Sequence, residues 1–279
     1  MTYSINNDHL LAGLKVTTAL TTKHSGDFDG QLPDTIVIHY TGGSTLEGAV
    51  SHLSKAKIQA SAHLVIGRDQ AITQLVDFNK KAWHAGKSQH LNRKGLNHYS
   101  IGIEIVNAGP LTKTGDGFIA SFGKNYPASE VIEATHRNES TPRYWHTYSE
   151  PQLSCVFSIC EALCERYDIQ HILGHEEIAP GRKSDPGPAF PLEKLRSELL
   201  ENRSEDMEDN SVDLSMQQLD QGIVKASSLN FRESPQANAR LLREPLPGGM
   251  PVSILSERDG WYKIKIEQLG WVKKEFIQL

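Results

Sequence analysis

Apolar residues form short runs and helical repeats over the first 200 residues of the chain. The run Thr35–Tyr40 is continuous and rich in β-branched residues; it begins after Pro33-Asp34 and ends at Gly42-Gly43. A run of this kind between turn-forming residues is typical of a buried central strand. His39 is therefore predicted to lie at the end of a strand.

One helix and three further strands are predicted before residue 107. Residues 44–54 have the length of a short helix, and residues 62–67 and 71–76 form the two strands of a hairpin. Residues 100–106 nearly alternate between apolar and polar side chains, which predicts a strand that exposes one side.

The pattern changes after this strand. Residues 107–143 are rich in Gly, Thr, Asn and Pro and lack periodicity, which predicts a long surface excursion. Helical spacing resumes at Ser149-Glu-Pro-Gln152, a capping box with proline in the first turn. Residues 171–174 return to strand, and a helix over 192–200 closes the region. Strands mixed with covering helices indicate an α/β layer architecture.

The chain is predicted to divide into a domain over 1–200, an acidic linker over 201–219 and a second domain over 220–279. Residues Glu201–Asp213 carry six acidic side chains and one basic side chain, so this stretch repels itself and cannot form a core. Beyond it, short strands alternate with Gly and Pro turns, which indicates a small β-barrel.

Composition narrows the class of protein. Of the 279 residues, 38% are hydrophobic and 23% are charged, and no apolar run is long enough to span a membrane. The formal net charge of -5 gives no reason to expect a nucleic-acid partner. Residues 1–10 have neither the basic start nor the apolar stretch of a secretory signal, so synthesis in the cytoplasm without Sec export is expected.

The cysteines predict no disulfide framework. Cys155, Cys160 and Cys164 lie on one predicted helix and are odd in number. An apolar helical setting raises the pKa of a thiol, so we expect core residues rather than ligands or nucleophiles.

The residues with the clearest chemistry lie in the loop Gly174–Phe190, which places His, Lys and Asp among several prolines and glycines. A catalytic zinc ion needs three protein ligands and one open position. His39, His175 and Asp185 can supply this set, because each histidine lies at the end of a predicted strand. Taken singly, a histidine is more often a surface or core residue, and an aspartate before proline is usually a turn former.

Five motifs together resemble a known family, the N-acetylmuramoyl-L-alanine amidases, which include AmpD-type amidases, T7-like phage lysozymes and peptidoglycan recognition proteins. The motifs occur in the family's order over about residues 30–200: Val37-Ile-His-Tyr-Thr41, Ser61-Ala-His-Leu-Val-Ile66 with Arg68-Asp69, Ala82-Trp-His-Ala-Gly86, Ser100-Ile-Gly-Ile-Glu104 and Gly174–Phe190. The last motif is similar to the AmpD-type branch in particular.

The resemblance implies a central mixed β-sheet flanked by helices, with Zn²⁺ held in a groove by His39, His175 and Asp185. Glu104 matches the family carboxylate that acts as general base on water and then passes a proton to the leaving amine. Lys183 matches the residue that stabilises the developing oxyanion.

Other positions of the motifs receive weaker assignments. His63 is expected to be structural, since a fourth protein ligand would close a zinc site. Where T7-like members carry tyrosine this chain has Ala62, so no tyrosine is expected to assist the reaction. Candidate substrate contacts are Trp83, His84, Tyr40 and Asn107, although a tryptophan in the core is an equal alternative for the first of these.

The C-terminal domain resembles a bacterial SH3-like domain. Leu229–Pro235 looks like its leading motif, and Gly260–Ile264 with Gly270–Val272 looks like its closing strands. In wall hydrolases such modules bind the wall and raise the local enzyme concentration. The alternative is a purely structural barrel that docks on the first domain.

These features predict a zinc amidase that cleaves the bond between the lactyl group of muramic acid and L-alanine in peptidoglycan. The SH3-like domain favours a cell-wall lytic enzyme, released by lysis or delivered by a non-Sec route. Two alternatives are a cytoplasmic amidase that recycles anhydro-muropeptides and a recognition module that binds peptidoglycan without cutting it.

Overall fold

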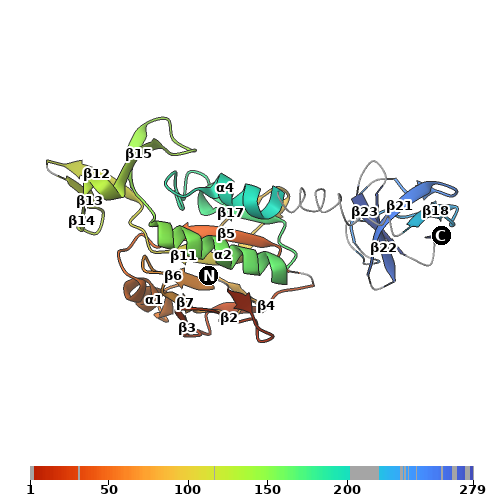
Figure 1. The fold of residues 1–279 in the computed structure, drawn as a ribbon, viewed down its shortest axis with the longest axis horizontal. Helices are drawn as coiled ribbons and strands as arrows, with labels where there is room; N and C mark the ends of the chain where they lie inside the picture. The colour runs from red at the N-terminus through yellow and green to blue at the C-terminus, as the bar shows by residue number, and fades with distance from the viewer. Residues whose placement is uncertain are drawn as a thin grey trace. The chain divides into compact units, whose positions relative to one another are not determined.

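In the computed structural model, the run Thr35–Tyr40 forms strand β5, an inner strand of a six-stranded mixed sheet (Figure 1). The strand order is β17-β5-β11-β6-β7-β3. The other strands are β3 (Val16–Thr18), β6 (Leu64–Ile66), β7 (Ile72–Gln74), β11 (Ser100–Ile105) and β17 (His171–Gly174). The predicted strands and the hairpin of β6 and β7 are therefore confirmed, with individual ends up to two residues shorter than expected.

The chain divides into two compact units, Met1–Glu201 and Asn202–Leu279. In the first unit the structure describes residues 3–30, 32–115 and 117–201. In the second unit it describes residues 220–232, 235, 237, 239–242, 244–258, 260–265, 269–273 and 277–278. Apart from Glu201, the predicted acidic linker lies outside the described residues.

The order and direction of the strands bring distant segments of the chain to one edge of the sheet. β5 pairs in parallel with β11 on one side and with β17 on the other. His39 is directly opposite Glu104, and Ile38 is opposite Gly174, the residue before His175. Because parallel strands end at the same edge, the residues at their carboxyl ends meet there.

Helices cover both faces of the sheet. α2 (Glu150–Arg166) begins at the N-cap Ser149, whose side chain accepts a hydrogen bond from the amide of Gln152, as the capping box predicts. Its apolar side packs with Ile36 and Ile103 in the main core, together with α4 (Leu192–Arg196). α1 (Leu46–Ser54) packs on the other side of the hairpin, and its N-cap is Thr45.

The predicted core thiols are confirmed. Cys155, Cys160 and Cys164 are buried on the side of α2 that faces the sheet. Burial raises the pKa of the Cys160 thiol well above its usual range, which keeps it protonated.

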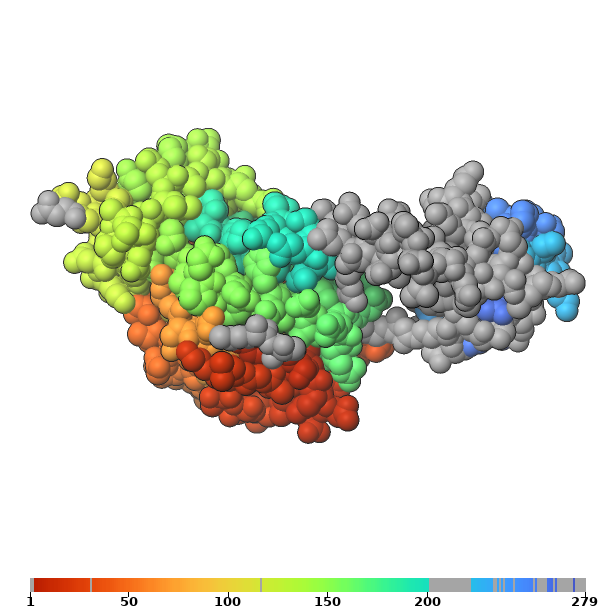
Figure 2. All heavy atoms as spheres, viewed as in Figure 1, coloured from red at the N-terminus to blue at the C-terminus, as the bar shows by residue number. Residues whose placement is uncertain are grey.

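The segment between β11 and α2 is not the irregular excursion that its composition predicts. It folds into a separate five-stranded antiparallel sheet of order β14-β13-β12-β16-β15, which projects from one end of the first unit (Figures 1 and 2). The strands are β12 (Pro110–Thr114), β13 (Gly117–Ala120), β14 (Asn125–Tyr126), β15 (Val131–Thr135) and β16 (Pro142–His146). We call this segment, residues 110–146, the inserted sheet. Periodicity was a weak guide here because the strands are short and have few buried residues.

Short elements complete the first unit. They are β1 (Ser4–Ile5), β2 (Leu11–Ala12), β4 (His24–Asp27), β8 (Lys80–Ala82), β9 (Gln89–His90), β10 (Arg93–Lys94), η1 (Leu96–His98), η2 (Ala128–Glu130), α3 (His175–Ile178) and the π-helical turn η3 (Ser197–Glu201). The predicted helix over 192–200 is thus α4 followed by η3. Within the described ranges, no helix has the length and apolar character needed to cross a membrane.

The second unit contains a five-stranded antiparallel sheet, which confirms the expected small β domain. Its strands are β18 (Asp220–Val224), β21 (Pro251–Arg258), β22 (Trp261–Lys265), β23 (Leu269–Lys273) and β24 (Ile277–Gln278), and a separate pair is formed by β19 (Ser228–Leu229) and β20 (Leu246–Pro247). Phe231, Ile254 and Ile264 lie in its core.

Candidate metal centre and pocket of the second unit

Three side chains converge at the carboxyl edge of the central sheet. Nδ1 of His39 lies 2.9 Å from Nδ1 of His175 and 2.9 Å from Oδ2 of Asp185, and the two latter atoms are also 2.9 Å apart. His39 is the last residue but one of β5, His175 begins α3 directly after β17, and Asp185 returns on the following loop. The structure therefore brings together the three residues that the sequence selects as metal ligands.

The tautomer of His39 follows from a chain of hydrogen bonds behind it. Nε2 of His84 lies 3.1 Å from the carbonyl oxygen of Ser100, which can only accept, so this nitrogen carries the proton. Nδ1 of His84 is then an acceptor, and it receives a hydrogen bond from Nε2 of His39 at 2.9 Å. Nδ1 of His39 is consequently left with a lone pair that points at the cluster.

His175 also presents the lone pair of its Nδ1 to the cluster, but its hydrogen-bond partners differ from those of His39. Its Nε2 lies 3.2 Å from the carbonyl oxygen of Ala85 and donates to it, so its Nδ1 also has a lone pair. Arg182 donates to the same carbonyl oxygen at 3.0 Å and to that of Lys87 at 2.7 Å, which fixes the acceptor in place. Both imidazoles are therefore oriented by their outer nitrogen, as is usual for metal-binding histidines.

Two lone pairs and a carboxylate oxygen within 2.9 Å of one another repel unless a positive charge lies between them. Burial lowers the pKa of His39 to about 4, so a proton on this ring does not supply that charge at neutral pH. The cluster has the donor set of a site for a divalent cation.

Glu104 lies on the adjacent strand beside this cluster. Its Oε2 is buried and has no hydrogen-bond partner among the residues that the structure describes. Burial raises the pKa of Glu104 to about 8, and the charge of Asp185 acts in the same direction, whereas the charge of Lys183 lowers it. A carboxyl group in this environment can exchange a proton near neutral pH.

Lys183 is exposed on the loop between His175 and Asp185. Its charge lowers the pKa of both Glu104 and His39. An exposed lysine at this position can move toward a developing negative charge without first breaking a buried contact.

A cleft of about 300 Å³ lies in front of Glu104. It runs between the carboxyl end of β5 and the first helix. Its walls are formed by Thr41, Gly42, Gly43, Gly48, Ala49, His52, Leu53 and Glu104. The cleft gives a bound molecule access to the Glu104 carboxyl.

The candidate substrate contacts lie in different surroundings. The Trp83 side chain is partly exposed and donates from Nε1 to Ser25, and the hydroxyl of Tyr40 is 2.7 Å from that of Ser184. The Asn107 amide is buried and bonded to backbone groups of His146 and Gly109. His84 is also buried, beneath His39.

His63 has the structural position that was expected for it. Its Nε2 donates to the carbonyl oxygen of Lys80 at 2.8 Å, and its Nδ1 accepts from the amide of Gly102 at 2.9 Å. The ring therefore joins β8 to β11, and neither nitrogen faces the cluster.

Gly102 is a contributor that sequence reasoning did not assign. A Cβ atom at this position would lie 2.3 Å from Cγ and 2.6 Å from Nδ1 of His84, so the His84 ring occupies the space that a side chain would need. The motif Ser100–Glu104 contains this glycine, but spacing alone does not show which ring packs on it. The role of His84 as the partner of His39 was missed for the same reason.

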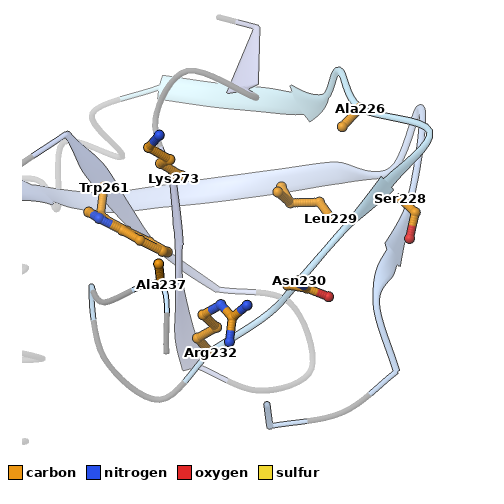
Figure 3. Close-up of a pocket in the computed structure, with 8 residues that line it drawn as sticks. All are labelled: Ala226, Ser228, Leu229, Asn230, Arg232, Ala237, Trp261 and Lys273. Carbon is orange, nitrogen blue, oxygen red and sulfur yellow. The ribbon is translucent and has the colours of Figure 1, made fainter. Parts of the chain in front are cut away.

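The second unit has a pocket of its own, of about 260 Å³ (Figure 3). Its lining residues are Ala226, Ser228, Leu229, Asn230, Arg232, Ala237, Trp261 and Lys273, which include two cations and no acidic side chain. Figure 3 shows the Trp261 indole and the Arg232 guanidinium group on neighbouring segments of the pocket. Arg232 is held there by a 2.6 Å hydrogen bond to the carbonyl oxygen of Ala239.

Comparison with known proteins gives two domain matches. Residues 29–188, more than half of the chain, match the family described as N-acetylmuramoyl-L-alanine amidase. Residues 227–278 match the bacterial SH3 domain.

Individual relatives agree with the first of these matches. The chain is 31% identical over 173 residues to the 1,6-anhydro-N-acetylmuramyl-L-alanine amidase AmpD of Escherichia coli K12, covering 61% of this chain and 74% of that protein. It is 30% identical over 171 residues to the N-acetylmuramoyl-L-alanine amidase AmiD of the same organism, covering 57% and 51%. The crystal structure of a Se-Met AmpD derivative superposes with a TM-score of 0.49 at 25% identity, covering 69% of this chain and 97% of that one.

Proposed function

Because the chain belongs to the N-acetylmuramoyl-L-alanine amidase family, we propose that it is a zinc-dependent hydrolase of peptidoglycan. The bond cleaved joins the lactyl group of muramic acid to the L-alanine of the stem peptide. The observation that carries the proposal is the meeting of two imidazole lone pairs with the Asp185 carboxylate at 2.9 Å. Nitrogen and carboxylate donors in this number suit a catalytic zinc site, which keeps one position open.

His39, His175 and Asp185 would hold the ion. When bound, zinc polarises a carbonyl group and activates water for attack at neutral pH. Hydrolysis of an amide also needs a proton acceptor for the attacking water and a proton donor for the leaving amine. Glu104 would perform both roles in turn, which is supported by its position in the lining of the cleft and by its Oε2, which has no described protein partner.

Lys183 would stabilise the negative charge that develops on the substrate during the reaction. As the scissile carbon becomes tetrahedral, its oxygen gains negative charge, and a nearby ammonium group stabilises that charge. The exposed Lys183 side chain can approach this oxygen from the loop that also carries Asp185. Tyr40 and Trp83 are partly exposed and remain candidates for substrate contact.

The second unit is proposed to bind the cell wall. Its pocket combines an indole surface with two cationic side chains, which suits a wall peptide that carries carboxylate groups next to apolar side chains. Tethering the catalytic unit to the polymer raises its local concentration there. Together, the two units favour an enzyme that acts on the polymer.

A second candidate function is cleavage of soluble 1,6-anhydro-muropeptides. It is supported by the 31% identity to an enzyme named for that substrate. Incubation of the purified protein with intact sacculi and with anhydro-muropeptides, followed by mass analysis of the products, distinguishes the two. Faster release of stem peptide from sacculi supports polymeric peptidoglycan as the substrate. Cleavage of the soluble substrate alone supports the second candidate function.

Two variants test the residue roles. Asp185→Ala is expected to abolish zinc binding, whereas Glu104→Ala is expected to retain zinc and lose turnover. Zinc content by mass spectrometry and stem-peptide release by chromatography measure the two effects. Absence of cleavage of either substrate with zinc added would contradict the enzymatic proposal and favour a binding-only protein.

A further inference from the structure

The inserted sheet meets the loop of the metal cluster at a buried pair of side chains. His136, which follows β15, and Glu176, which follows His175, are 2% and 5% exposed. Nε2 of His136 lies 2.7 Å from Oε2 of Glu176. Neither residue belongs to the cluster, and the mechanism above uses neither.

The hydrogen bond between them has a fixed direction. Nδ1 of His136 accepts from the backbone amide of Asn138 at 3.2 Å, so Nε2 carries a proton and donates it to Glu176. The Asn138 side chain also donates to the carbonyl oxygen of Glu176 at 2.9 Å. Two groups at the end of the inserted sheet therefore hold Glu176.

Glu176 in turn holds the segment that contains Asp185. Its backbone amide donates to the carbonyl oxygen of Asp185 at 2.8 Å. Its Oε2, the atom that His136 binds, accepts from the amide of Gly187 at 2.9 Å. Glu176, which follows the ligand His175, thus fixes the backbone on both sides of Pro186, which follows the ligand Asp185.

Two aromatic residues complete this contact. Gly187 lies so close to Trp145 of β16 that a Cβ added to the glycine would be 2.9 Å from the indole ring. The same indole stacks on the His136 ring, with the ring centres 5.5 Å apart. Tyr148, just after the inserted sheet, donates from its hydroxyl to the carbonyl oxygen of Pro186 at 2.8 Å. The backbone at 186–187 therefore contacts Trp145 and Tyr148 directly and is held by His136 through Glu176.

We propose that the inserted sheet positions the metal cluster, with His136 acting through Glu176 to hold the Asp185 carboxylate within reach of the two imidazoles. His136 is a positioning residue and not a catalytic residue, since it touches neither ligand. The inference rests on the proposed function, because it assumes that the cluster binds zinc. Arg182 and Ser184 anchor the first part of the loop between His175 and Asp185 to Ala85 and Tyr40, and the contacts from the side of the inserted sheet fix the part that follows Asp185.

The alternative is that His136 only stabilises the inserted sheet. His146 provides a matched control, since it is an equally buried histidine of the same sheet. Its Nε2 donates to Glu130 at 3.2 Å and its Nδ1 accepts from the amide of Ala108, so its partners lie in or beside the inserted sheet. A structural role predicts the same behaviour for His136→Phe and His146→Phe.

The test is the zinc affinity of the full chain, measured by competition with a chromophoric chelator. We expect His136→Phe to weaken zinc binding by about 10-fold or more, the lower end of the effect of removing an outer support of a metal site. His136→Gln retains a donor near the position of Nε2 and is expected to restore most of the affinity. His146→Phe is expected to lower the unfolding temperature but to leave zinc affinity within about 3-fold.

Equal zinc affinity in wild type and His136→Phe would overturn the inference, as would equal losses in His136→Phe and His146→Phe. If His136→Phe does not fold, Asn138→Ala removes the other donor from the inserted sheet to Glu176, and unchanged zinc affinity in that variant overturns the inference. Failure of the wild-type chain to bind zinc at all would overturn the proposed function as well. The outcomes therefore separate the two claims.

Discussion

The contact between Gly102 and His84 provides a sharp test of how the metal cluster is supported. In Gly102→Ala the new Cβ would lie 2.3 Å from Cγ of His84, and the backbone cannot retreat because β11 is paired on both sides. The His84 ring has to move, which removes the acceptor for Nε2 of His39. We expect a loss of stability of about 1–3 kcal/mol from overpacking. Zinc affinity is expected to fall by about 10- to 100-fold, because the tautomer of His39 is no longer fixed.

A double-mutant cycle tests whether displacement of the His84 ring causes the loss of zinc affinity in Gly102→Ala. His84→Ala removes the same acceptor without adding bulk, so its zinc affinity is expected to match that of Gly102→Ala. In the double variant the extra methyl group lies in the space that the ring has vacated. It should then cost no further zinc affinity and little further stability, so the two substitutions are expected to be strongly non-additive.

Zinc competition titrations and chemical denaturation of the four proteins provide the measurements. Additive losses in the double variant would refute the reasoning, because they would show that Gly102→Ala acts by a route other than His84. Wild-type zinc affinity in His84→Ala would refute the assigned tautomer chain as well. Unfolding is to be measured with chelator present, so that bound metal does not contribute to stability.

Three further predictions follow from the described geometry. Glu104→Gln keeps the shape of the side chain but cannot accept a proton, so turnover of a soluble muropeptide is expected to fall by about 10²-fold or more at unchanged zinc content; equal activity would exclude Glu104 as the base. Trp261→Ala is expected to reduce binding to sacculi in a pull-down while turnover of the soluble substrate stays unchanged, and unaltered binding would remove the pocket from the wall interface. The metal-free protein is expected to lose stability as the pH falls from about 6.5 to about 4. Burial holds the pKa of both His39 and His63 at about 4, so the unfolded chain takes up two protons that the folded protein does not, each at a cost of about 1.4 kcal/mol per pH unit, and Glu104 with its raised pKa offsets only one of them; denaturation midpoints that are constant over this range would contradict it.

The central sheet was predictable from sequence because its signals are local and strong. Thr35–Tyr40 and Ser100–Ile105 are continuous apolar runs bounded by turn residues, and α2 has both a capping box and helical spacing. The likeness of five ordered motifs then selected His39, His175 and Asp185 among twelve histidines and many acids. The structure brings these three together.

The supports of the cluster were not predictable in the same way. His84 and Gly102 contact each other across the fold, and His136 reaches Glu176 from a segment 40 residues earlier. Contacts of this kind leave no periodic pattern in a single sequence. The inserted sheet was missed because its strands are two to five residues long and half exposed, so neither alternation nor length distinguishes them from loop.

The edge position of β17 has a consequence for how activity appears during synthesis. This strand pairs with β5 alone, and it and the loop that follows supply two of the three cluster residues from the last part of the first unit. A nascent chain that ends before residue 185 can form β5 and β11 but cannot complete the cluster, whatever else has folded. Since domains fold as units while the chain emerges from its N-terminus, hydrolysis should begin only after this late strand has joined the sheet. The order of the strands thus delays the chemistry until the catalytic unit is nearly whole.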